Sequence, residues 1–148
     1  MAAFVYDTND SNNFSRTVDA SGNALGVNTD VTISTLAAAG ANSNSADQTN
    51  AGGSGLTLVI DITAISGAAA TLVVTIQGKD VASGKYYTIL ASASLTATST
   101  TVLQVYPGNT AVANVAVNSK LPRTWRASYT ITGTTPSITA TIGACVTY

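Results

Sequence analysis

Residues 56–63 read Leu-Thr-Leu-Val-Ile-Asp-Ile-Thr, and this stretch decides the fold class. Large apolar residues occupy every second position, from Leu56 to Ile62, and Asp61 is among the residues between them. A period of two residues is typical of a β-strand that buries one face and turns the other outward. We therefore predict a strand here, with Asp61 on the face that meets solvent or a partner.

Similar patterns recur along the chain. Further strands are expected at residues 31–36, 71–76, 86–91, 101–106, 123–132 and 137–148. Turn signals separate them at Ser66-Gly67, Pro107-Gly108 and Gly133–Pro136, and a loop is expected from Asn109 to Pro122. The Ala-rich stretch 36–41 is too short to count as a helix. Six or seven short strands predict an all-β protein, an antiparallel β-sandwich or jelly-roll-like domain.

The first 55 residues differ from the rest. Residues 1–30 are polar and irregular, and residues 40–55 end in Asn-Ala-Gly-Gly-Ser-Gly, which is typical of a flexible linker or long loop. We therefore divide the chain into an N-terminal arm and linker with one short strand (1–55) and a sandwich domain (56–148). An extended arm can add a strand to a neighbour's sheet edge. Its expected partner contacts are three aromatic anchors and one basic residue: Phe4, Tyr6, Phe14 and Arg16.

The composition argues against an enzyme. The chain has no histidine, no glutamate, seven scattered aspartates and a single cysteine, Cys145. Histidine or paired carboxylates supply most acid–base catalysis, and zinc sites need Cys and His. Cys145 has no neighbouring base or cation to activate it, so we expect a small buried hydrophobe. Nothing in the sequence brings Asp61 within about 5–10 Å of Asp80, as a glycosidase pair requires. We expect no catalytic residue, metal or cofactor.

Charge and hydrophobicity together indicate an assembly subunit. Only 9% of residues are charged, the formal net charge is -1, and 45% are hydrophobic. Soluble monomers usually have a surface that is about a quarter or more charged. A nearly neutral surface can pack against neighbours with little desolvation cost. Lys120, Arg123 and Arg126 are interpreted as a solvated strand end, so no nucleic-acid partner is expected.

The N-terminus predicts synthesis in a reducing cytosol. It lacks a basic segment followed by an apolar run, so no signal peptide is expected. The apolar stretches are shorter than the ~20 residues that cross a bilayer, so no membrane partner is expected. A lone cysteine cannot form an internal disulfide.

Two local motifs each have two interpretations. Residues 7–13 superficially resemble a calcium loop, but the sixth and twelfth positions hold Asn12 and Val18 instead of Gly and Glu, which favours a polar arm. The stretch from Gly78 to Leu90 is a hairpin with two tyrosines at the start of its second strand. A glycan-binding hypothesis uses three aromatic residues as stacking platforms: Tyr86, Tyr87 and Trp125. The structural interpretation instead packs one tyrosine inward, covers an edge with the other and makes Trp125 a core anchor.

Four segments carry a resemblance to a known group of proteins. They are the strand 56–63, the hairpin Gln-Gly-Lys-Asp…Gly-Lys-Tyr-Tyr-Thr-Ile-Leu (77–90), Leu-Pro-Arg-Thr-Trp-Arg (121–126) and Ile-Thr-Gly-Thr-Thr-Pro-Ser-Ile-Thr (131–139). Residues 56–148 resemble the small β-sandwich structural proteins of tailed bacteriophages, and head decoration (cement) proteins most of all.

The resemblance implies a virion protein, made in the host cytoplasm and placed on the capsid surface. Its implied partners are the major capsid protein and copies of itself, as a homotrimer, and its implied role is to stabilise contacts between capsomers. The alternative is a glycan- or receptor-binding tail or fibre module.

Overall fold

The computed structural model describes residues 28–148, and this part of the chain is all-β with no helix. The predicted arm contacts Phe4, Tyr6, Phe14 and Arg16 lie outside the described residues. The strands are β1 (Thr29–Ala39), β2 (Ser43–Asn44), β3 (Gln48–Thr49), β4 (Gly55–Lys79), β5 (Tyr86–Ala91), β6 (Ser99–Tyr106), β7 (Ala116–Asn118) and β8 (Thr124–Thr147).

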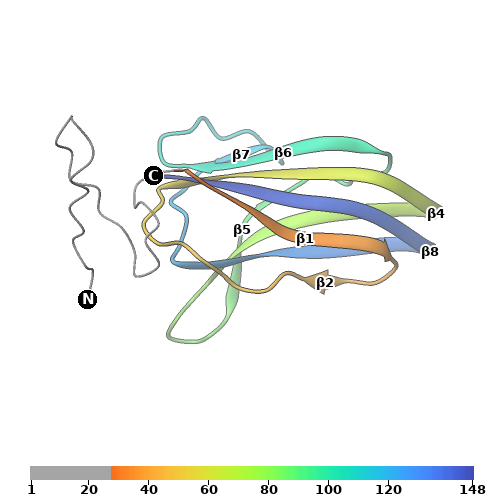
Figure 1. Ribbon diagram of the computed structural model, residues 1–148, viewed down its shortest axis with the longest axis horizontal. Helices are drawn as coiled ribbons and strands as arrows, with labels where there is room; N and C mark the ends of the chain where they lie inside the picture. Colours follow the sequence, from red (N-terminus) through yellow and green to blue (C-terminus); the bar gives the residue numbers. More distant parts are fainter. Residues whose placement is uncertain (1–27) are drawn as a thin grey trace, which may run out of the picture.

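Two long strands form the spine of the molecule. β4 has 25 residues and β8 has 24, and they pair antiparallel from Gly55 opposite Thr147 to Gly78 opposite Trp125. Both strands turn back at the same place, on the right of Figure 1. The turns predicted at 66–67 and 133–136 are therefore bends inside continuous strands and do not end them. β4 and β8 remain paired on both sides of the bend because both strands bend at the same place. The register shifts between them are confined to the bend.

Backbone contacts require glycine at the centre of this bend. Gly67 has φ 107° and Gly133 has φ 124°, both in the left-handed region that side chains disfavour. A Cβ on Gly67 would lie 2.7 Å from the carbonyl oxygen of Thr135. A Cβ on Gly133 would lie 2.8 Å from the Cα of Ala70. The two strands approach each other so closely here that neither position has room for a side chain larger than a hydrogen atom.

The bend folds one sheet into two layers. In the first layer the order is β1, the second half of β8, the first half of β4, β6 and β7; in the second it is β2 and β3, the first half of β8, the second half of β4, and β5. We call the side where both long strands turn back the bend end, and the opposite side, where Asn28 and Tyr148 lie, the loop end (Figure 1).

The inward faces of both layers form one core. Trp125 and Tyr129 are its largest side chains, each 1% exposed. The core contains the inward faces predicted from the alternation, namely Leu56, Leu58, Ile60, Ile62, Leu72, Val74, Ile76, Trp125, Ala127, Tyr129, Ile131, Ile138, Ala140, Ile142 and Ala144. The all-β, sandwich-like prediction is confirmed. The predicted loop 109–122 contains one extra strand, β7, which pairs in parallel with β6.

The interpretation of residues 40–55 as a linker is wrong. β1, β2 and β3 all pair with β8, so residues 29–49 contribute edge strands to the sandwich. Side chains complete this edge: Asn42 Oδ1 accepts from the amide of Ile131 at 2.7 Å, and Ser45 Oγ accepts from that of Ala127 at 3.0 Å. Asn and Ser are typical loop residues, so composition alone could not reveal that they satisfy a sheet edge.

Candidate functional site

The two ends of the sandwich differ in charge. The described chain carries nine charged side chains: Asp30, Asp47, Asp61, Lys79, Asp80, Lys85, Lys120, Arg123 and Arg126. Asp61, opposite Thr141, is the one nearer the bend, and the other eight lie toward the loop end. The bend end consists of residues 37–42, 63–70, 93–98 and 132–137, and these segments contain no charged residue.

The bend end presents small side chains on a strained backbone. Ala38, Ala69 and Thr135 have φ values of 49°, 53° and 47°, and each such left-handed residue costs about 1 kcal/mol. Ala38 and Ala69 are exposed. A shallow hollow of about 290 Å³ opens beside Gly67, with Ile65 and Thr96 in its wall. This end is an uncharged surface of small side chains.

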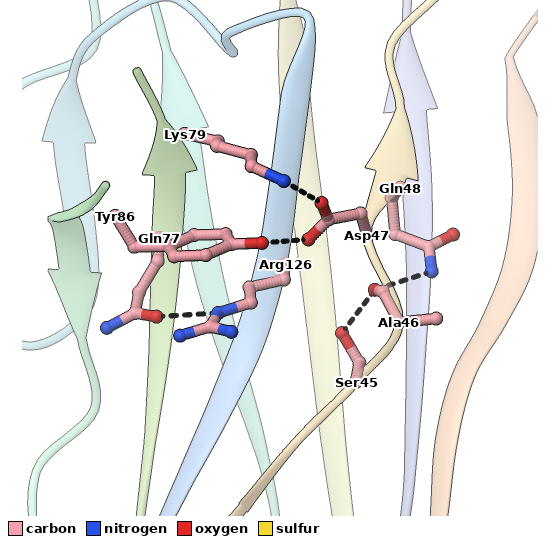
Figure 2. Close-up of polar contacts among 8 residues, drawn as sticks. All are labelled: Ser45, Ala46, Asp47, Gln48, Gln77, Lys79, Tyr86 and Arg126. Atoms are coloured by element: carbon pink, nitrogen blue, oxygen red, sulfur yellow. Dashed lines mark hydrogen bonds and ion pairs between the residues drawn. The ribbon is translucent and has the colours of Figure 1, made fainter. Parts of the chain in front are cut away.

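At the loop end, polar side chains tie three strands together on the outer face of the second layer (Figure 2). Asp47 Oδ2 accepts from Lys79 Nζ at 2.8 Å, and Asp47 Oδ1 accepts from the Tyr86 hydroxyl at 2.6 Å. The bonds from Lys79 and Tyr86 lower the pKa of Asp47, and the bond to Asp47 raises the pKa of Lys79. The segment between β2 and β3 is thereby fastened to β4 and β5.

Arg126 completes this group, which we call the polar cluster (Asp47, Gln77, Lys79, Tyr86, Arg126). Its guanidinium carbon lies 3.5 Å from the centroid of the Tyr86 ring. Its Nε donates to Gln77 Oε1 at 2.9 Å. A stacked and hydrogen-bonded guanidinium has a fixed plane and direction, which is the arrangement that recognises planar anions.

The structure separates the three predicted aromatic residues. Tyr86 has Arg126 against its ring, and Tyr87 is 49% exposed beside Gly78 and Pro122. Trp125 is in the core, so its use as a stacking platform is wrong and its interpretation as a core anchor is confirmed. The three rings therefore form no common surface.

Asp61 and Asp80, which nothing in the sequence brings together, lie in different layers of the structure. Asp61 lies on the outer face and accepts from Thr100 Oγ1 at 3.0 Å. Asp80 lies in the turn after β4, where bonds from Ser83 and Ala82 lower its pKa. Asp61 belongs to the first half of β4, in the first layer, and Asp80 follows the second half, in the second layer, so the core lies between them. A hydrolytic pair is therefore not formed.

Cys145 was expected to be buried, and it is not. The inward positions of β8 are Ala144 and Val146, so Cys145 points outward and is half-buried. It lies opposite Asp30 in the register of β1. The Asp30 carboxylate favours the protonated thiol, as hydrogen-bond acceptor and as a like charge to the thiolate, and raises its pKa. This makes Cys145 a poor nucleophile.

Sequence reasoning missed the polar cluster. Arg126 was interpreted as part of a solvated strand end and Gln77 follows the predicted strand 71–76, so only the register places them opposite each other. Asp47 was assigned to a linker. Within residues 28–148, no group of three His, Cys, Asp or Glu side chains could hold a metal ion. The same residues contain no helix long and apolar enough to cross a membrane.

We compared the chain with protein-family models, with curated proteins and with solved structures, and none of the three comparisons gave a match.

Proposed function

We propose that the protein is a non-enzymatic virion subunit, a capsid decoration protein that binds the outer capsid surface and stabilises contacts between capsomers. The uncharged bend end is the observation that carries this proposal. The centres of protein interfaces are depleted of charged residues, and small uncharged side chains lose little hydration when buried. The bend end is thus suited to contact the major capsid protein.

The arm supplies a second contact at the opposite end. The described chain begins at the loop end, and residues 1–27 can reach at most about 90 Å from there. With the bend end on one capsomer, the anchors Phe4, Tyr6 and Phe14 could contact another. Individually weak contacts become strong when many copies bind a symmetric lattice. Association of the subunit with its own copies, as a trimer, would add to the same effect.

A matched pair of substitutions at Ala69 tests the contact at the bend end. Asn and Asp tolerate the left-handed backbone of this exposed position, so Ala69→Asn and Ala69→Asp should both fold. Because an unpaired buried charge is costly, Ala69→Asp should lower affinity for capsids at least ~10-fold, while Ala69→Asn should not. Co-sedimentation with capsids of the virus that encodes the protein measures this. Equal binding of the two variants would contradict the proposal.

Deletion of residues 1–27 tests the arm. β1 begins at Thr29 and pairs with β8, so the deletion must stop at residue 27 to keep the sandwich intact. We expect an unchanged circular dichroism spectrum and loss of particle binding. Particle binding at wild-type affinity would remove the role assigned to the arm.

A second candidate function, glycan binding in a tail or fibre module, is favoured only by the exposure of Tyr87. It predicts binding on a glycan array that is lost in Tyr87→Ala and kept in Tyr148→Ala. An array without Tyr87-dependent binding would eliminate it.

A further inference from the structure

Arg126 has donors that residues 28–148 do not use. Its Nε is bonded to Gln77 and its guanidinium stacks on Tyr86, but Nη1 and Nη2 have no hydrogen-bond partner among residues 28–148. Figure 2 shows these terminal nitrogens on the Gln77 side of the ring, away from Asp47. The guanidinium is thus fixed on the outer face of the second layer with two donor nitrogens unbonded.

Asp47 acts on Arg126 only through space: the Arg126 charge helps to lower the pKa of Asp47, but no hydrogen bond joins the two side chains. Asp47 has one oxygen bonded to Lys79 and the other to Tyr86. Asp80 is bonded within its own turn, to Ser83. The polar cluster has two cations and one anion, so its net charge is +1 (2 − 1). An acidic group from outside would complete it.

A guanidinium edge binds a carboxylate through two parallel hydrogen bonds, and a guanidinium that is already immobilised loses less entropy on binding. Two residues further along each strand, Thr75 and Ser128 lie opposite each other on the same outer face and offer hydroxyls. We propose that Arg126 is a carboxylate-binding residue for an acidic side chain of a protein that packs against the outer face of the second layer.

The shape of this face favours a protein over a small molecule or a sugar. Small ligands bind in concave sites, and three hollows in the described part of the chain, beside Gly143, Gly53 and Gly67, do not include Arg126. A sugar would need an open aromatic ring, and Arg126 stacks on that of Tyr86. A half-buried sheet face with one directed cation instead suits the acidic side chain of a neighbouring protein.

The carboxylate preference can be measured in the isolated full-length protein. The probe is acetate, titrated at constant ionic strength with chloride as the balance, and the readout is the ¹⁵N NMR signals of the guanidinium groups. Arg123 is exposed and serves as internal control. The Arg126 signals should shift saturably, with a Kd about 5-fold or more below that of Arg123. Equal responses, or a response to phosphate alone, would overturn the proposal.

Two variants distinguish the effect of the fixed guanidinium orientation on acetate binding from the effect of nearby positive charge. Gln77→Leu removes the acceptor that orients Nε, and should weaken acetate binding at Arg126 about 3-fold. Lys85→Gln removes an exposed charge outside the polar cluster and should leave it unchanged. An unchanged Kd in Gln77→Leu would show that the geometry has no effect and would contradict the inference.

The nature of the partner rests on the proposed function, so a second measurement is needed. Arg126→Lys keeps the positive charge but loses the planar guanidinium that can form two parallel hydrogen bonds with a carboxylate. It should lower capsid affinity about 5-fold in co-sedimentation. Wild-type affinity of Arg126→Lys would overturn the partner assignment. The proposed function itself is tested separately, because it depends on the Ala69 pair at the other end of the molecule.

Discussion

The bend end and the loop end are built from the same two strands but are held together by different means. At the bend end the backbone determines the structure: Gly67 and Gly133 let the strands touch, and no charged side chain is present. At the loop end the structure is determined instead by side-chain hydrogen bonds, those of Asn50 and of the polar cluster. A surface specified by backbone can remain uncharged and be buried by a partner. A surface specified by polar side chains keeps directed donors such as Arg126.

The largest effect is expected from Gly67→Ala. The new Cβ would meet the backbone of Thr135 and Pro136 at a φ of 107°, so we expect a loss of about 3 kcal/mol in the free energy of unfolding. Gly84 is the control: its φ is 69°, but open space surrounds it, so Gly84→Ala should cost about 1 kcal/mol. Urea unfolding measures both. Equal losses would show that backbone contact does not define the bend end.

Asn50→Ala should give the next largest effect, at the loop end. The Asn50 side chain is buried, donates to the carbonyls of Gly53 and Leu121, and accepts from the amides of Gly52 and Gly53. Leaving these groups unpaired should cost about 2–3 kcal/mol in urea unfolding.

Asn118 provides the matched control. It makes one exposed bond, from the Gly108 amide at 2.9 Å, so Asn118→Ala should cost no more than about 0.5 kcal/mol. If Asn50→Ala costs as little, side-chain bonding does not hold the loop end together.

A smaller effect is expected at Cys145. Asp30 raises the pKa of the thiol, so Asp30→Asn should lower that pKa and increase the thiolate fraction. The rate of reaction with a chromogenic disulfide at pH 8 should rise about 3-fold. Asp61→Asn, which changes a carboxylate nearer the bend, should not alter the rate. A rate unchanged by Asp30→Asn would show that the carboxylate does not control the thiol.

The smallest effect concerns the pH dependence of the polar cluster. The pKa of Asp47 is 3.8 in the unfolded chain and lower in the folded protein, so folding favours the ionised form. Its stabilising contribution is present above pH 3.8 and is lost as the pH falls through the folded-state pKa. The difference in urea midpoint between wild type and Asp47→Asn should therefore be constant from pH 7 to 5 and vanish at lower pH.

A substitution of Lys79 tests the cause of this pH dependence. Its hydrogen bond is the main reason for the lowered pKa of Asp47, so in a Lys79→Met background the pH-dependent part of the difference should shrink. A midpoint difference that persists at pH 2 would contradict the assignment to Asp47 ionisation.

Much of the fold could be predicted because alternation is local. The inward series from Leu56 to Ile62 and from Trp125 to Ile131 follow from side chains that alternate between two faces. The bends at Gly67 and Gly133 were predicted as turns that end strands. Glycine occurs both in turns between strands and at bends within a strand, so its presence does not distinguish the two. The candidate site was harder still, since Asp47, Tyr86 and Arg126 are brought together by three separate pairings.

The sequence by itself determined the strand class, the inward faces, the shortage of charge and the lack of histidine and glutamate, because these depend on residue type and on a period of two. Only the tertiary structure decided that two strands run through both layers, that eight of nine described charges lie toward one end, and that Arg126 is fixed with its donors outward. These features depend on register and on where paired strands bend. Register is set by the mutual packing of distant segments, which no local pattern encodes.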